Sequence, residues 1–206
     1  LRHTPSVEAF CRHVADTYER LDFIVNNACQ TVRRPPAFYE HMMELEAGPL
    51  AQLPSEAARL VGAYEGLRGY DMLSSGRAAE VAPVALPVGV THAAQLSQAS
   101  LLPDDHSGRG DLFPEGRLDQ DLQQVDLRDR NSWRLTLAEV SSVELLETQL
   151  VNAVAPFVLN ARLKPLMLRT PERDKHIVNV SAVEGQFYRN FKTSRHPHTN
   201  MAKAAL

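Results

Sequence analysis

The segments His176-Ile-Val-Asn-Val-Ser-Ala-Val-Glu-Gly185 and His198-Thr-Asn-Met-Ala-Lys-Ala-Ala-Leu206 decide the fold that we predict. The first begins with an apolar run of strand length and ends in small residues. The second follows a proline, which is favoured at the start of a helix, and carries Lys203 one turn in. We therefore predict a strand over 176–180 and a helix that begins near residue 198 or 199.

The N-terminal part of the chain has the pattern of a helix followed by a strand. Thr4 is the expected N-cap and Pro5 the first helical position. The short apolar run over 22–26 predicts a buried strand of a parallel sheet. Apolar residues at spacings of three and four form the inner face of the helix: Val7, Phe10, Val14, Tyr18 and Leu21.

The C-terminal part has the same order of elements. Ser141 and Ser142 are expected to cap a long helix that ends near Pro171, and the strand over 176–180 and the last helix follow. Helix, strand, insertion, helix, strand and helix is the order of a doubly wound sheet. We therefore predict the α/β class, with an incomplete Rossmann-like doubly wound parallel sheet in one partial domain over 1–206.

Residues 31–134 are predicted to be a long helical and loop insertion in this domain. Helices are expected over 38–46 and 55–67, whereas the Pro, Gly, Ser and Asp content of 71–131 favours a long loop. Five residues of the first helix are expected to pack on their own core, with a lid or a dimer contact as alternatives: Phe38, Tyr39, Met42, Met43 and Leu45.

The composition is that of an ordinary globular domain. The 206 residues are 44% hydrophobic and 23% charged, and the net charge of -3 indicates no nucleic-acid or membrane partner. The two cysteines form no disulfide framework, which favours reduced thiols and a cytoplasmic location. No metal site is predicted, because His196 and His198 are the only close pair of ligands. Since residue 1 is not Met and residue 206 lies in a helical pattern, we expect a piece of a longer protein.

Small and amide side chains follow both predicted strands. Asn26, Asn27 and Ala28 follow the first strand, and Ser181 and Ala182 follow the second. Open parallel sheets bind ligands at the carboxyl ends of their strands. These residues are therefore candidates for a ligand site, although the two asparagines are also common where a strand ends in a turn.

Four motifs together resemble the short-chain dehydrogenase/reductase family. They are Asn-Asn-Ala at 26–28, Val-Asn at 151–152, Ile-Val-Asn-Val-Ser at 177–181 and Ala-Lys-Ala-Ala at 202–205. The resemblance covers residues 1–30 and 135–206. It implies hydride transfer between NAD or NADP and a small carbonyl or alcohol substrate, and a possible homo-oligomer.

The resemblance also implies two sets of site residues. The catalytic set is Asn152, Ser181, Thr199 and Lys203, and the cofactor-binding set is Asn26, Asn27, Ala28, Cys29 and Lys203. Thr199 stands where the family has its proton-donating tyrosine, and a threonine hydroxyl has a far higher pKa than a phenol near 10. The reacting serine corresponds to Ala182, or to Ser181 if the match shifts by one residue.

Further departures concern the cofactor and the proton donor. Cys29 replaces the usual glycine, and no glycine-rich phosphate loop occurs in the 206 residues. Tyr188, His196 and His198 are candidate replacements for the missing tyrosine. Because Pro156 has no N–H, we expect the carbonyl of Asn152 to be free to hold a water. The sequence thus predicts an oxidoreductase, or alternatively an inactive relative that serves as a dinucleotide sensor or interaction scaffold.

Overall fold

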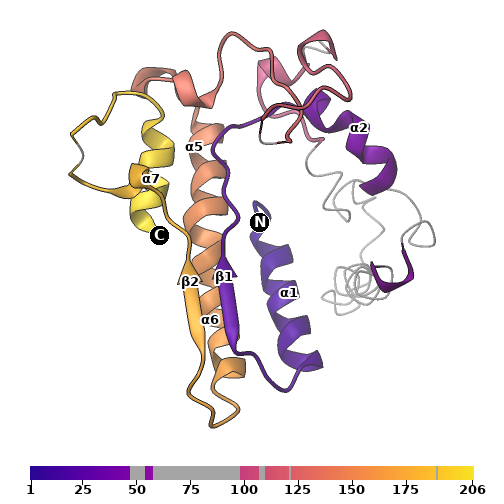
Figure 1. The fold of residues 1–206 in the computed structure, drawn as a ribbon, viewed down its shortest axis with the longest axis vertical. Coiled ribbons are helices and arrows are strands. Elements are labelled where there is room, and N and C mark those ends of the chain that lie inside the picture. The colour runs from indigo at the N-terminus through magenta and orange to yellow at the C-terminus, as the bar shows by residue number, and fades with distance from the viewer. Residues whose placement is uncertain (47–53, 58–97, 107–109, 121, 189) are drawn as a thin grey trace, which may run out of the picture. The chain divides into compact units, whose positions relative to one another are not determined.

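A computed structural model describes residues 1–46, 54–57, 98–106, 110–120, 122–188 and 190–206 (Figure 1). The chain divides into two units, one formed by Leu1–Arg33 with Arg130–Leu206 and the other by Arg34–Asp129. The helices and strands of the first unit are α1 (Thr4–Thr17), β1 (Phe23–Asn26), η4 (Ser132–Arg134), η5 (Leu137–Glu139), α5 (Ser142–Gln149), η6 (Leu150–Val154), α6 (Ala155–Met167), β2 (His176–Asn179), η7 (Val183–Gly185) and α7 (Pro197–Ala205). Those of the second unit are α2 (Pro36–Glu46), η2 (Pro103–His106) and η3 (Gly110–Leu112).

The first helix, α1, begins one residue earlier than predicted and ends before Tyr18 and Leu21 of the predicted inner face. Phe10 is 38% and Tyr18 52% exposed, so the prediction that these two residues lie on the inner face is wrong. His3, with extended backbone, is the N-cap and makes no side-chain cap bond, so the prediction of Thr4 as the cap is wrong. The helix ends at Thr17, and Tyr18 is the C-cap. Arg169 satisfies the free carbonyls of Ala15 and Tyr18 at this end, through N–H···O distances of 2.8 and 3.0 Å.

The core of the first unit lies where α1 and α6 meet β1. Leu21 lies beyond the end of α1 and still packs against this core. The burial of the apolar side chains of this core away from water is the main contribution to the stability of the unit. Its buried members are Val7, Cys11, Ile24, Ala155, Leu163 and Met167.

The sheet contains two parallel strands in the described residues, β1 and β2, paired in register from Phe23 with His176 to Asn26 with Asn179. The predicted doubly wound Rossmann-like sheet is therefore wrong: the described chain is mostly helical, with one small parallel pair. A doubly wound sheet is covered by helices on both faces. Here Ile24 is buried, whereas Phe23 is 57% and Val25 62% exposed, and every residue of β2 is exposed.

The long helix predicted after Ser141 is present as three successive parts. Ser141 caps α5, since its Oγ accepts a hydrogen bond from the N–H of Glu144 at 3.1 Å. The helix then widens into a π turn, η6, just before Pro156, and continues as α6. Proline in a helix interior removes one hydrogen bond and clashes with the preceding turn, and a π turn is one way to absorb this.

In the second unit, Phe38 and Tyr39 of the predicted cluster pack locally, whereas Met42 is 44% exposed. The Phe38 ring lies edge-on to those of Tyr39 and Phe113, at centroid distances of 5.0 and 5.5 Å. Gln124 donates a hydrogen bond to the carbonyl of Phe113 at 2.9 Å. Most of the helix predicted over 55–67, and residues 71–97 of the predicted loop, lie outside the described residues.

Candidate functional site

The carboxyl ends of β1 and β2 lie side by side. The N–H of Val180 donates to the carbonyl of Asn26 at 3.0 Å, which extends the parallel pairing by one residue. The buried side chain of Asn26 donates to Asn179 at 2.8 Å and to Asn160 at 3.0 Å. Asn26 thus ties the two strands to α6, and its amide faces the protein interior.

The three residues after β1 that are predicted to bind a cofactor are all exposed. Asn27, Ala28 and Cys29 have extensive solvent contact. They follow the strand directly and are small or uncharged, so a ligand can approach their backbone. Cys29 and Cys11 are both free thiols, and Cys11 is buried in the core.

Asn152 holds the residue that follows this exposed segment. It lies in the π turn η6 and is 1% exposed. Its Oδ1 accepts a hydrogen bond from the N–H of Gln30 at 2.7 Å, and its Nδ2 donates to the carbonyl of Gln30 at 3.0 Å. The Asn152 side chain thus contacts the backbone of Gln30, a residue that the sequence did not single out.

Ser181 and Lys203 meet at the carboxyl end of β2. The Lys203 ammonium donates to the carbonyl of Val180 at 3.0 Å, and the Ser181 hydroxyl donates to the carbonyl of Lys203 at 3.0 Å. The backbone approaches closely here, because a Cβ on Gly185 would lie 2.6 Å from the Lys203 carbonyl oxygen. Only glycine therefore lets η7 pack against α7 at this point.

Thr199 and Ala182 occupy the positions where the sequence resemblance expects the tyrosine and serine. Thr199 is 1% exposed, and its Oγ1 has no hydrogen-bond partner among the described residues. Ala182 is exposed, and its carbonyl accepts a hydrogen bond from the N–H of Gly185 at 3.0 Å. Neither side chain offers a group that releases a proton near neutral pH.

The three candidate proton donors point to different surroundings. Tyr188 is 96% exposed, whereas His198 is buried and directs Nε2 toward Glu144 on α5. His196 adopts a left-handed backbone conformation as the N-cap of α7, and its ring packs on Trp133 at a centroid distance of 4.2 Å. Burial lowers the pKa of His196, although the nearby Glu184 carboxylate opposes the shift.

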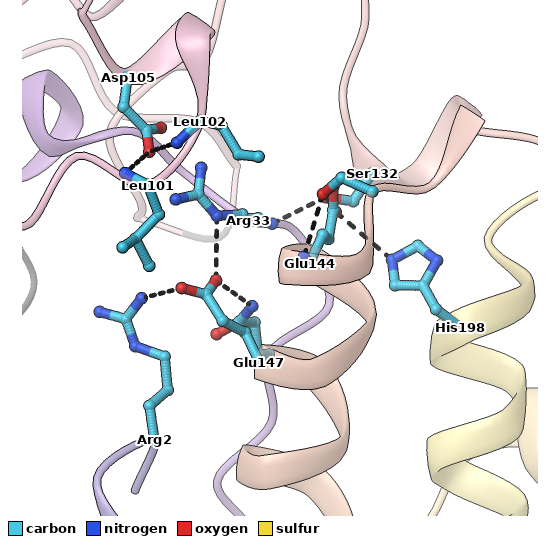
Figure 2. A network of polar contacts seen from close by, with 11 residues as sticks. Arg2, Arg33, Leu101, Leu102, Asp105, Ser132, Glu144, Glu147 and His198 are labelled. Carbon is cyan, nitrogen blue, oxygen red and sulfur yellow. Dashed lines mark hydrogen bonds and ion pairs between the residues drawn. The ribbon is translucent and has the colours of Figure 1, made fainter.

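Two carboxylates of α5 form a buried polar network that sequence reasoning missed (Figure 2). Glu147 accepts hydrogen bonds from Arg2 at 2.7 Å and Arg33 at 3.0 Å. Glu144 accepts a hydrogen bond from the Ser132 hydroxyl. Arg33 and Ser132 lie inside the predicted insertion, yet they belong to the first unit. The three-residue spacing of the glutamates on one helix face was the available signal.

The environment of Glu144 favours its charged form. Burial raises its pKa, but the contacts from His198 and Ser132 outweigh burial, and the pKa is lowered below its ordinary value. The Nε2 of His198 lies 3.4 Å from a Glu144 oxygen, which is an ion-pair distance without the geometry of a hydrogen bond. The described residues contain no group of three or more side chains suited to a metal ion.

Comparisons with known proteins give little to identify this chain. No protein-family model and no solved structure matches it. One curated relative, Uncharacterized protein R665 of Acanthamoeba polyphaga mimivirus, is 34% identical over 82 residues, which is 40% of this chain. The match spans 17% of that protein's length. The described helices include none that is long and apolar enough to cross a membrane.

Proposed function

We propose that the chain forms the nicotinamide end of the site of an NAD(P)-dependent oxidoreductase of the short-chain dehydrogenase type. Its substrate is a small carbonyl or alcohol. The observation that carries the proposal is the hydrogen bond of the Ser181 hydroxyl to the backbone carbonyl of Lys203, at the end of β2 that pairs with the end of β1. The exposed segment of Asn27, Ala28 and Cys29 follows the end of β1. The proposed function rests on these residues and not on a doubly wound sheet.

The donor groups of the site fit a nicotinamide ribose. The Lys203 ammonium has three N–H donors, and the contact with the Val180 carbonyl uses one of them. Lys203 is 6% exposed, and in the proposed complex its other two donors meet ribose hydroxyls. The exposed backbone at Ala28 and Cys29 leaves room for a ring, whereas the Asn26 amide is already engaged with Asn160 and Asn179.

The chemistry divides between the cofactor and the chain. A bound nicotinamide supplies or accepts the hydride. While its proton stays on the Lys203 carbonyl, the Ser181 oxygen can accept a hydrogen bond from the hydroxyl of an alcohol substrate. Lys203 holds the ribose, and Asn152 acts through Gln30. A positioned general acid contributes roughly 10² to 10⁴ in rate, and Thr199 cannot serve as one near neutral pH. We therefore expect slow turnover.

Cofactor titration tests this function. Trp133, the one tryptophan of the chain, packs on the N-cap of α7, so its fluorescence reports on this region. We expect NADH or NADPH to quench it saturably, and K203M to weaken binding by about tenfold, one lost charge-assisted contact. The matched control is K164M, at an exposed lysine of α6.

Competition by fragments of the cofactor sharpens the same experiment. The 206 residues contain no glycine-rich phosphate loop, so the adenine half has no counterpart among the residues assigned to the site. Reduced nicotinamide mononucleotide should therefore compete with NADH, and AMP should not. Absence of quenching by both dinucleotides, or equal weakening by K164M, would contradict the proposal.

A second function is favoured by the burial of Thr199 and the directions of the candidate donors. With Tyr188 in solvent and His198 facing α5, a protein of this kind would bind a dinucleotide as a sensor or interaction scaffold without hydride transfer. It predicts saturable NADH binding with no oxidation of NADH across a panel of aldehydes and ketones. Rapid oxidation with any of them would rule this function out.

We include a cytoplasmic location in the proposal, supported by the free thiols of Cys11 and Cys29. The homo-oligomer also stays a prediction. Sedimentation of the purified chain at several concentrations would test it, with a single monomeric species as the contrary result.

A further inference from the structure

The exposed segment of Asn27, Ala28 and Cys29 lies between two fixed points. At one end, the Asn26 side chain is bonded to Asn160 and Asn179. At the other end, both backbone polar groups of Gln30 are bonded to Asn152. A three-residue segment held at both ends has few conformations open to it, so its shape before ligand binding depends on how firmly these ends are held.

Glu147 holds the second of these ends from α5. Its Oε2 accepts a hydrogen bond from Arg33 Nε at 3.0 Å and a long one from the side-chain Nε2 of Gln30 at 3.4 Å. Its Oε1 accepts from Arg2 at 2.7 Å. Figure 2 shows the carboxylate between the two arginines. One side chain therefore joins the segment after β1, the start of the chain and α5.

Burial makes this ion pair sensitive to the loss of either partner. The Glu147 side chain is 7% and that of Arg33 9% exposed, so both charges are largely removed from water. Removing one partner of a buried ion pair costs far more than removing one partner of a surface pair. Loss of the Glu147 charge is thus expected to release Arg33 and Gln30 together.

We propose that Glu147 is a positioning residue, which holds the segment of Asn27, Ala28 and Cys29 in its ligand-binding shape through Gln30 and Arg33. The ligand is the nicotinamide end of a dinucleotide, and this part of the inference rests on the proposed function. Glu147 itself does not touch the exposed segment in any contact that the structure gives. It acts on the ligand through the residues that it holds.

The experiment compares E147Q with unmodified chain and with E8Q. Glu8 forms an exposed ion pair with Arg162 in the same unit, which makes E8Q a matched control. Hydrogen exchange of the backbone N–H of Gln30 reports on its bond to Asn152. The rate at which a disulfide reagent modifies Cys29 reports on the exposed segment. The affinity for NADH is the third measurement, and circular dichroism confirms folding.

We expect E147Q to speed exchange at Gln30 by tenfold or more, to change the Cys29 rate several-fold and to weaken NADH binding by about tenfold. E8Q should change none of these. If E147Q does not fold, R33K replaces it, because it keeps the charge but loses the planar donor geometry. R33K should shift all three measurements in the same direction by smaller factors.

The outcomes separate this inference from the proposed function. Unchanged Gln30 exchange and Cys29 reactivity in a folded E147Q or R33K would overturn the positioning role. Equal changes in E8Q would overturn it too. If the unmodified chain does not bind NADH, the proposed function and the choice of ligand fail, whereas faster Gln30 exchange in E147Q would still support Glu147 as the residue that holds this segment.

Discussion

At the scale of single residues, Thr199 carries a polar group that the proposed chemistry does not use. Its hydroxyl is buried without a hydrogen-bond partner among the described residues. An unsatisfied buried polar group costs about 1 to 3 kcal/mol. We expect T199V, which is close in shape, to raise the free energy of unfolding by about 1 kcal/mol, measured by urea denaturation. T199S is the control, because it keeps the hydroxyl and loses a methyl group. A T199V protein less stable than the unmodified chain would show that the hydroxyl has a partner.

The two thiols also differ at this scale. Cys11 is 2% exposed in the core, and burial, followed by the nearby Glu8, raises the pKa of its thiol. Cys29 is exposed after β1. Because the thiolate is the reactive form, a disulfide reagent at pH 8 should modify one thiol per folded chain rapidly and the second only after unfolding. The C29S variant should lose the rapid phase. A rapid phase retained in C29S would mean that Cys11 is accessible.

At the scale of elements, the start of α5 carries a testable cap. Ser141 accepts the N–H of Glu144, whereas the adjacent Ser142 is the first residue of the helix and is exposed. Replacing an N-cap serine by alanine costs about 1 kcal/mol. We expect S141A to lower the free energy of unfolding by this amount and S142A to change it little. Thermal or urea unfolding of the two variants measures the difference, and equal losses would argue against Ser141 as the cap.

The elements themselves could largely be predicted from sequence. The periodicity of α1, the apolar runs of β1 and β2 and the proline before α7 place each element within a few residues of where it lies. These signals are local, because side-chain spacing follows helix or strand geometry directly. The π turn before Pro156 was not predicted, since the sequence indicates that a hydrogen bond is lost but not how the helix adjusts.

At the scale of the whole chain, the fold prediction failed because the order of helices and strands was taken to indicate a doubly wound sheet. Two apolar runs separated by a long insertion specify one parallel pair, and the further strands of a doubly wound sheet were inferred from the order of the elements. The site was partly predictable: Lys203 and Ser181 do meet at the end of β2. The spacing of Glu144 and Glu147 was visible, but their partners were not predictable. The contacts of Gln30 and Glu147 join residues more than 100 positions apart, and such contacts leave no periodic signal.

The stability of the first unit should depend on acid pH through Glu144. This carboxylate contacts Ser132 and His198 and lies near Arg33, so it connects segments that are distant in sequence. Because its folded-state pKa is lowered, its contribution to stability is fully present above the ordinary value of about 4.5. This contribution is lost as the pH falls through the lowered folded-state pKa.

Urea unfolding between pH 7 and pH 3 should therefore show a smaller loss of stability below pH 4.5 in E144Q than in the unmodified chain, although E144Q is the less stable protein at pH 7. Other carboxylates with lowered pKa values, such as Glu172, titrate in both proteins and cancel in the comparison. Parallel pH profiles for the two proteins would show that Glu144 gains no net stabilisation from its charge.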